Sequence, residues 1–349
     1  MARCGPRRNV KPRHGIVEVE VTRGGRRESV HAVAWVVAGA DDRPVDGVGG
    51  GLPDVFPRSA VKPLQALPVV ETGAADRFDL GSDELALAAA SHSGEAEHVA
   101  GVRGMLAKAG CTVAELSCGV HPPFAAAAAA DLVRRGLEPS AVEHNCSGQH
   151  AAFLLVARQL GVSPQGYTAA DHPVQRLVTQ ALADLAGLPL AADRLGIDGC
   201  GIPTFAIPLD RLAVAWARLA APDAVAVPHR AAARRVLAAM IANPRLVAGS
   251  DRFDTLVMEA VGPRVVVKAG AEGVSCAALP DAGLGIAVKA LDGAGRAAEV
   301  VMATLLGRHL TDLSPGGAAV VAARAAPVIR RGDGTPVGGL RLAAGSRLD

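Results

Sequence analysis

The sequence is poor in aromatic residues. Of its 349 residues, 3% are Phe, Trp or Tyr, with two tryptophans and a single tyrosine. Surfaces that bind nucleic acid combine clustered basic side chains with aromatic rings on which bases stack. Here the net charge is only +2, and the 36 Lys and Arg residues are scattered along the chain. We therefore expect no nucleic-acid partner.

Long hydrophobic runs and paired cysteines are also missing. The apolar stretch AVAWVVAGA at 32–40 is far shorter than the roughly 20 residues that a bilayer-spanning helix needs. The basic N-terminus is not followed by an apolar segment of signal-peptide form. The six cysteines form no CxxC pair, so any metal site must combine distant segments. We expect a cytoplasmic protein without a membrane partner, in which most cysteines are thiols.

Apolar residues, by contrast, make up half of the chain, which is enough for a large core. We expect one domain over residues 1–349, with room for two lobes. Alternating apolar and polar residues around an RGG turn predict a β-hairpin at 15–40, and similar alternation predicts strands within 264–279 and 283–292. Helical patterns lie at 59–72, 83–90, 95–109, 124–136, 148–161, 171–187, 228–243 and 296–310. Strands near both ends with helices between them predict an α/β fold, with one sheet built from both ends of the chain.

The stretch PRSAVKPLQ at 57–65 places Lys62 three residues after Ser59 and directly before Pro63. Proline fits a helix only in its first turn, so Ser59 should lie at a helix N-terminus, where developing negative charge is stabilised. Lys62 would then lie about one turn away, close enough to accept the hydroxyl proton if its pKa is lowered. The commoner interpretation of such a tetrapeptide is a helix-capping serine and a solvated lysine.

Two further stretches contain similar groups. SHSGE at 91–95 ends a run of small residues with Ser91, and serines that cap a helix are the simpler interpretation. VVVKAGAEGV at 265–274 places Lys268 in a strand-like apolar segment, where a lysine on a sheet edge is the simpler interpretation. The glycines and alanines after Lys268 suggest close approach of a ligand to the backbone. If the two lysines lie together, each lowers the pKa of the other.

Two cysteines occupy glycine-rich polar turns. Cys146 lies in EHNCSGQHAAFL at 143–154, and Cys200 lies in GIDGCGIPTFAIPL at 196–209. A buried structural thiol is the usual interpretation of a lone cysteine. Two of them in such turns indicate a site for a metal or for substrate contact, although spacing alone does not show that they meet.

Taken in order, PRSAVKPLQALP, SHSGE, NCSGQHAAFL, DGCGIPTFAIPL and KAGAEGV resemble the L-asparaginase II family, the class 3 or Rhizobium-type asparaginases. The resemblance covers roughly residues 15–345. It implies an α/β/α sandwich similar to serine β-lactamases and glutaminases, in a homodimer that hydrolyses L-asparagine to L-aspartate and ammonia. The small-molecule substrate would be processed by two Ser-Lys tandems near a zinc ion.

The resemblance also implies roles for individual residues. It pairs Ser59 with Lys62 and Ser91 with Lys268 as the two catalytic tandems. It assigns substrate binding to Arg58, His150, Asp198 and Asp254. Asp254 lies in GSDRFDT at 249–255 and would occupy a pocket position where the Rhizobium enzyme has a cysteine.

The zinc site implied by the resemblance is changed in this sequence. The family holds the ion with residues matching Cys146 and Cys200 and with a lysine three positions after the first cysteine. Gln149 occupies that lysine position. An amide oxygen is a weaker zinc ligand than an amine, so the change argues against a closed zinc site and leaves the two cysteines as pocket thiols.

The mechanism we expect is attack by a serine on the side-chain amide of asparagine, with lysine as base. Ser59 fits the nucleophile best because of its place at a helix start, while Ser91 would attack or relay protons. One alternative is a penicillin-recognising hydrolase, since S-x-x-K followed by Lys268-Ala269-Gly270 resembles the motifs of those enzymes, although no S-D-N element is evident. The other is a non-catalytic amino-acid-binding protein, which would have no need of two serines and two lysines.

Overall fold

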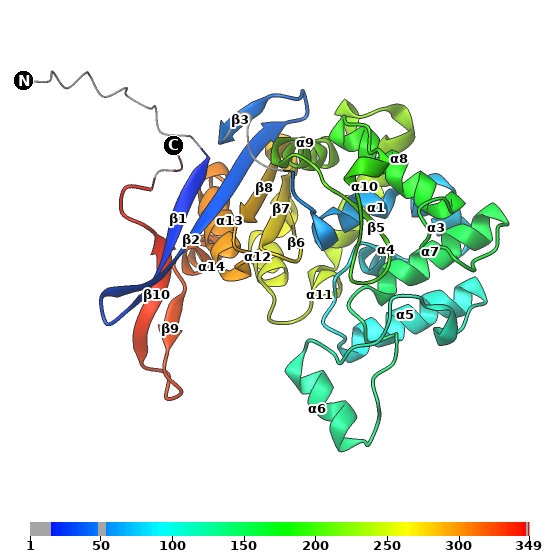
Figure 1. Cartoon of the computed structure of the whole chain (residues 1–349), viewed down its shortest axis with the longest axis horizontal. Helices are drawn as coiled ribbons and strands as arrows, with labels where there is room; N and C mark the ends of the chain where they lie inside the picture. Colours follow the sequence, from blue (N-terminus) through cyan, green and yellow to red (C-terminus); the bar gives the residue numbers. More distant parts are fainter. Residues whose placement is uncertain (1–14, 48–53, 347, 349) are drawn as a thin grey trace, which may run out of the picture.

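An antiparallel sheet forms one side of the molecule (Figure 1). The computed structural model describes residues 15–47, 54–346 and 348. The hairpin predicted at 15–40 is confirmed as β1 (Ile16–Arg23) and β2 (Arg26–Gly39). The other strands of the sheet are β3 (Pro44–Gly47), β6 (Val266–Ala269), β7 (Val274–Leu279), β8 (Leu284–Ala290), β9 (Val328–Arg330) and β10 (Pro336–Leu342).

The strand order β6-β7-β8-β2-β1-β10-β9 joins the two ends of the chain, with β3 added beside β2. Strand β2 pairs with β8 from Val33–Ala290 to Gly39–Leu284, and β1 pairs with β10. The prediction of a sheet built from both ends of the chain is therefore confirmed. Strand β6, which carries Lys268, lies at one edge of this sheet.

Helices cover both faces of the sheet. In β2, Val33, Trp35 and Val37 face one core, which is completed by α12 (Phe253–Val261), α13 (Gly295–His309) and α14 (Pro315–Ala325). The alternate residues Ala34, Val36 and Ala38 face the other core, together with α9 (Leu209–Ala220). The period-two alternation of a strand produces this division. The expected α/β/α sandwich is confirmed.

Glycine permits the close packing of α9 on the sheet. A Cβ atom added at Gly285 of β8 would lie 2.1 Å from the carbonyl oxygen of Ala213 and 2.2 Å from the amide nitrogen of Ala217. A larger residue at this position would force α9 away from β8. The second core would then be opened along its length.

The rest of the chain forms a helix-rich body beside the sheet (Figure 1). Its helices are α1 (Lys62–Gln65), α2 (Leu67–Glu71), α3 (Ala74–Arg77), α4 (Ser82–Ala88), α5 (Ala96–Ala109), α6 (Ala126–Arg134), α7 (Ser147–Leu160), α8 (Pro173–Ala186), α10 (Val227–Ala242) and α11 (Pro244–Val247). A small two-stranded sheet, β4 (Leu195–Ile197) with β5 (Pro203–Phe205), lies beside them. No helix in the described part of the chain is long and apolar enough to cross a membrane.

The single helix predicted at 59–72 is wrong. The structure divides this stretch into a 3₁₀ turn, η1 (Arg58–Val61), followed by α1 and α2. Pro63 and Pro68 each lie in the first turn of their helix. Because proline has no N–H to donate to the preceding turn, the chain starts a new helix at each proline.

Candidate active site

A small cavity lies between η1 and the end of β6. The loop at Ser91–Ser93, called the SHS loop below, and the turns that carry Cys146 and Cys200 complete its wall. Its volume is about 370 Å³, and it is lined by Arg58, Ser59, Ser91, His121, Phe124, His144, Asn145, Cys146, Asp198, Gly199, Cys200, Arg252, Ala269, Gly270 and Ala271. Ligand cavities in proteins commonly measure about 300 to 1,000 Å³. This cavity suits a small polar molecule. Both predicted serines, both cysteines, Arg58 and Asp198 line it, although these residues are far apart in the sequence.

Ser59 reaches the cavity from η1, which packs tightly against the turn after β6. Its neighbour Arg58 has a positive φ of 51°, an unusual backbone angle for a residue with a side chain. A Cβ at Gly270 would lie 2.4 Å from the carbonyl oxygen of Pro57 and 3.1 Å from the amide nitrogen of Ala60. The glycine after Lys268, interpreted from sequence as a place of ligand approach, is thus approached by the protein's own chain.

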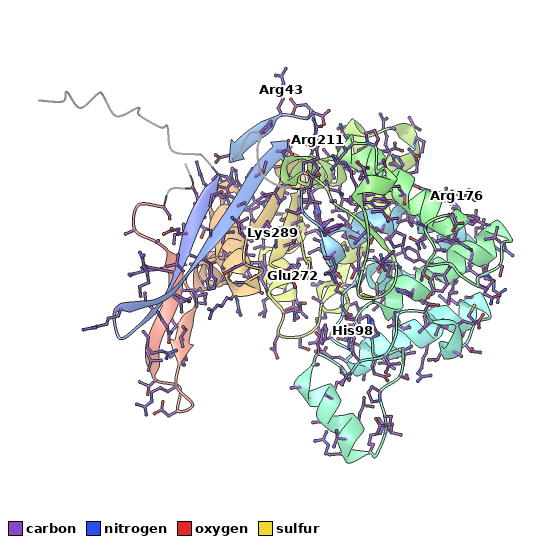
Figure 2. The ribbon with its side chains drawn as sticks, viewed as in Figure 1. Arg43, His98, Arg176, Arg211, Glu272 and Lys289 are labelled. Atoms are coloured by element: carbon purple, nitrogen blue, oxygen red, sulfur yellow. The ribbon has the colours of Figure 1, made fainter. Side chains whose placement is uncertain are left out.

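The turn between β6 and β7 is itself fixed by contacts with β8. The side chain of Lys289 donates to the carbonyl oxygen of Glu272, and Figure 2 shows the two residues side by side at the centre of the molecule. The amide of Ala290 donates to the carbonyl oxygen of Gly273, 2.9 Å away. These bonds hold the turn whose residues Ala269 to Ala271 form one wall of the cavity.

Arg58 and Asp198 form an ion pair on the cavity wall. Arg58 Nη2 donates to Asp198 Oδ1 over 2.9 Å, which raises the pKa of Arg58. Asp198 belongs to a tight turn in which Gly201, with φ of 86°, donates its N–H to the Asp198 carbonyl oxygen. The turn leaves the carboxylate accessible from the cavity.

Lys62 is buried behind this cavity and is only 2% exposed. Its Nζ donates to the carbonyl oxygen of Ala90 over 2.8 Å and to Cys146 Sγ over 3.0 Å. Within the described residues, these are its hydrogen-bond partners, and Ser59 is not among them. Lys62 therefore contacts the backbone directly before Ser91 and also contacts a cysteine turn.

Lys268 is also buried, although it lies on the edge strand β6. Its Nζ donates to the carbonyl oxygen of Ala269 over 2.8 Å and lies 3.8 Å from Asp254 Oδ2. Burial lowers the pKa of Lys268 to about 7, since Asp254 compensates only in part and the charges of Lys62 and Arg252 lower it further. Lys268 is thus an amine that is partly neutral near pH 7.

Asp254 supports this edge of the sheet rather than lining the cavity. Its Oδ2 accepts the N–H of Ala269 over 2.8 Å, next to the Lys268 amine. Its side chain is buried in the first turn of α12. The predicted substrate contact of Asp254 is not among the cavity-lining positions described by the structure.

The hydroxyl of Ser91 is buried and has no hydrogen-bond partner among the described residues. An unpaired buried hydroxyl is costly and calls for an explanation, such as a ligand or a reacting group. Its backbone is well held, because the Ser91 N–H donates to the carbonyl oxygen of Val247 over 2.9 Å.

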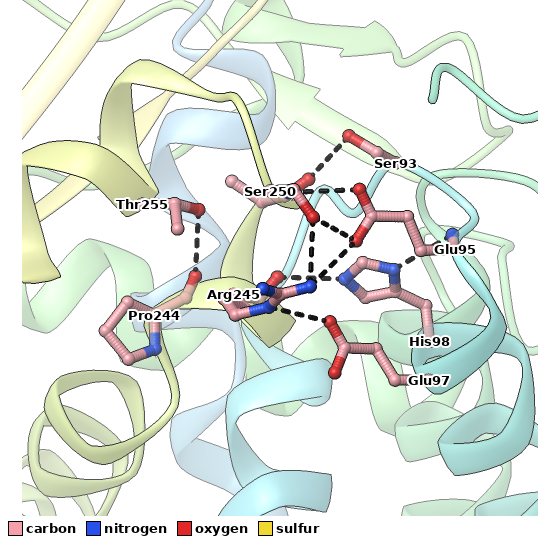
Figure 3. A network of polar contacts seen from close by, with 9 residues as sticks. Ser93, Glu95, Glu97, His98, Pro244, Arg245, Ser250 and Thr255 are labelled. Carbon is pink, nitrogen blue, oxygen red and sulfur yellow. Dashed lines mark hydrogen bonds and ion pairs between the residues drawn. The ribbon is translucent and has the colours of Figure 1, made fainter. Parts of the chain in front are cut away.

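A polar network joins residues 93–98 to residues 244–255 (Figure 3). Ser93 Oγ donates to the carbonyl oxygen of Ala248, and Glu95 accepts from the N–H and the hydroxyl of Ser250, both over 3.0 Å. Arg245 donates to Glu97 and lies 3.9 Å from Glu95. The network joins the SHS loop to the loop that leads into α12.

Glu95, Glu97 and His98 of this network lie close enough together to hold a metal ion. The two ring nitrogens of His98 are already used, however. Nδ1 accepts the Glu95 N–H over 3.0 Å, and Nε2 contacts the carbonyl oxygen of Arg245 over 2.9 Å. With no lone pair left for a metal, we interpret the network as structural support for the loops.

Cys146 and Cys200 both line the cavity, and each affects the pKa of the other. The hydrogen bond from Cys200, the charge of Lys62 and the hydrogen bond from His144 hold the pKa of Cys146 well below its usual range. The same pairing and burial raise the pKa of Cys200. Cys146 is therefore the more acidic thiol of this pair. All five cysteines in the described part of the chain are free.

The residues around these cysteines do not fit the zinc site that the resemblance implies. Gln149 is fully buried, and its Nε2 donates to Gln65 Oε1 over 2.7 Å. Among the described residues, no third His, Cys, Asp or Glu joins the two cysteines. The Lys62 amine contacts the Cys146 sulfur instead. Two thiols with a lysine cation beside them lack the ligands of a tetrahedral zinc site.

His150 lies behind the cavity, not on its wall. Its Nδ1 lies 2.7 Å from the hydroxyl of Tyr167, which also accepts the N–H of Ser117. His150 Nδ1 thus bonds the Tyr167 hydroxyl, and Nε2 has no partner in the described structure. Burial lowers the pKa of His150 to about 3, so the ring is neutral.

Sequence reasoning missed several residues of the cavity wall. His121 stacks on Phe124 at 4.6 Å between ring centroids, and both line the cavity with His144, Asn145 and Arg252. His144 and Asn145 directly precede Cys146 in a motif that was singled out, where Asn145 was noted as a polar neighbour without a role, and Arg252 lies two residues before Asp254. No pattern in the sequence marked His121 or Phe124.

The fold and the cavity together define an α/β protein with a polar cavity lined by hydroxyl, thiol, imidazole and guanidinium groups. The sequence profile of the L-asparaginase II family matches residues 19–342, nearly the whole chain. The chain belongs to the L-asparaginase II family.

Other comparisons add little detail. Among solved structures, the chain is similar to a candidate beta-lactamase from Bacteroides dorei, with 13% sequence identity and a TM-score of 0.33 over 80% of this chain and 86% of that one. No curated protein sequence matches the chain.

Proposed function

We propose that this protein hydrolyses L-asparagine to L-aspartate and ammonia by a serine–lysine mechanism. The observation that carries the proposal is the convergence of two serines on one cavity, with two fully buried lysines directly behind its wall. Family membership supports amide hydrolysis of this kind. A buried amine with a pKa of about 7 supplies a base at physiological pH.

In the first half of the reaction, the Ser59 oxygen attacks the side-chain amide carbon while its proton passes to Lys268, directly or through Ser91. The tetrahedral intermediate then loses ammonia, which takes up that proton, and an ester on Ser59 remains. In the second half, water donates a proton to the same amine and attacks the ester carbon. As the ester C–O bond breaks, the amine returns this proton to the Ser59 oxygen, so aspartate leaves and the Ser59 hydroxyl is restored.

Lys62 has a different part in this proposal. Because its Nζ bonds Ala90 and Cys146, it fixes the backbone next to Ser91 and adds a positive charge that keeps Lys268 from holding its proton. Asp198, whose carboxylate faces the cavity, is suited to the α-ammonium group of the substrate. Arg58 holds that carboxylate in place.

The direct test is to incubate the purified protein with L-asparagine and to measure ammonia release. We expect turnover with L-asparagine and formation of aspartate in equal amount. Acylation by penicillin without asparagine hydrolysis would instead indicate a penicillin-recognising enzyme. Stoichiometric asparagine binding in calorimetry with no ammonia release would indicate a binding protein.

We further propose that the reaction needs no zinc, because Gln149 bonds Gln65 and Lys62 contacts the Cys146 sulfur. Elemental analysis of the purified protein should find far less than one zinc per chain. Incubation with a chelator should leave the rate of ammonia release unchanged. One equivalent of tightly bound zinc, lost together with activity on chelation, would contradict this prediction.

A further inference from the structure

Arg252 is an arginine on the cavity wall that has no side-chain partner among the described residues. Its side chain lines the same cavity as Ser59 and Ser91, and it is half-buried. Within the described residues, its guanidinium makes no ion pair and no hydrogen bond. Nearby arginines differ, since Arg58 is paired with Asp198 and Arg245 with Glu97.

The position of Arg252 is fixed by the backbone around it. It is the residue directly before α12, and its carbonyl oxygen accepts the N–H of Leu256 over 3.0 Å. Two residues earlier, the amide and hydroxyl of Ser250 are held by Glu95 (Figure 3). Gly249, with φ of 124°, packs so closely on Ser93 that a Cβ there would lie 2.5 Å from Ser93 Oγ. The loop therefore presents Arg252 on a rigid support.

The charges around the cavity indicate which ligand group the Arg252 guanidinium suits. A partly buried guanidinium without a counter-ion presents five donors that suit a carboxylate in two-point geometry. The Asp198 carboxylate on the wall already bonds Arg58. Among the described residues, Arg252 thus forms no ion pair on the cavity wall, although its charge acts on the Lys268 amine and on the carboxyl group of Glu299.

We propose that Arg252 binds the α-carboxylate of the amino-acid substrate and so selects substrates that carry this group. The inference rests on the proposed function, because it assigns one end of the asparagine molecule to Arg252. With the α-carboxylate on Arg252 and the α-ammonium on Asp198, the side-chain amide is left for the serines.

The test compares L-asparagine with β-alaninamide, which is asparagine without its α-carboxylate. In Arg252→Ala, KM for L-asparagine should rise about tenfold to a hundredfold, as expected for loss of a charge-assisted hydrogen bond, with kcat changed much less. The kcat/KM for β-alaninamide should stay at the wild-type value. Arg252→Lys keeps the positive charge but cannot make a two-point contact with a carboxylate. Its KM for L-asparagine should therefore lie between those of wild-type protein and Arg252→Ala. Arg176→Ala, on the distant helix α8 (Figure 2), is the control.

The outcomes separate this inference from the proposed function. If wild-type protein hydrolyses L-asparagine but Arg252→Ala keeps its KM, the inference is wrong. Equal losses with both substrates would also overturn it, because they indicate a structural role. If wild-type protein releases no ammonia, calorimetry with L-aspartate still tests the inference. Binding that weakens at least tenfold in Arg252→Ala supports it, and unchanged or absent binding overturns it.

Discussion

Ser59→Ala should lower kcat for L-asparagine by about 10⁴-fold or more, since it removes the nucleophile. Ser59 lines the cavity from η1, whose backbone is fixed by its contact with Gly270. The variant should therefore keep the wild-type structure while losing its reacting oxygen. Ammonia release measures the rate, and mass spectrometry after acid quenching detects the acyl-enzyme, which should form only when Ser59 is present.

Two other serines give this prediction its controls. Ser91→Ala should lower the rate by about a hundredfold, as for loss of a proton relay, but should still form the acyl-enzyme. Ser314 caps α14 by accepting the N–H of Gly317 over 3.1 Å, so Ser314→Ala should cost about 1 kcal/mol of stability without loss of rate. If Ser91→Ala prevents acylation while Ser59→Ala permits it, the nucleophile is Ser91.

Lys268→Met should lower kcat by about 10²- to 10⁴-fold because it removes the general base. Methionine keeps most of the side-chain length in a position that is only 1% exposed. Asp254 retains its bond from the Ala269 N–H, so β6 should stay in place. Lys108→Met, which replaces an exposed lysine on α5 that does not line the cavity, is the control and should retain the full rate.

The pH profile gives a second measure of Lys268. A base acts only when it is unprotonated, so kcat/KM of wild-type protein should rise with pH through about 7 and level off above it. Below that pH, the amine carries its proton and cannot accept another. The remaining activity of Lys268→Met should lack this rise of kcat/KM with pH. A wild-type profile that is flat from pH 5 to 9, with an unchanged rate in Lys268→Met, would rule out Lys268 as the base.

Much of the fold was predictable from local patterns. The alternation at 15–40 and the glycine and proline positions gave the hairpin and most helices within a few residues, because these signals act between near neighbours. The helix at 59–72 was predicted wrongly, since each proline acts as a first-turn residue of a new short helix. The argument that placed Ser59 at a helix N-terminus is weakened, because Ser59 lies within the short 3₁₀ turn η1.

The site was predictable only in part. Ser59, Ser91, Cys146 and Cys200 all line the cavity, as their motifs suggested. His150 and Gln149, which share the NCSGQH motif, instead bond Tyr167 and Gln65 behind it. Successive positions on a helix point in different directions, so a motif names candidates without showing which of them face the ligand.

By itself, the sequence determined the α/β character of the chain, its family and the serines, lysines and cysteines available for chemistry. Only the tertiary structure decided that Lys62 bonds Cys146 rather than Ser59, that Lys268 is buried on an edge strand, and that Arg252 lines the cavity without an ion pair to any described residue. The reason is that partners and pKa values depend on burial and on charges from distant segments. Neither quantity exists until the two ends of the chain meet in one sheet.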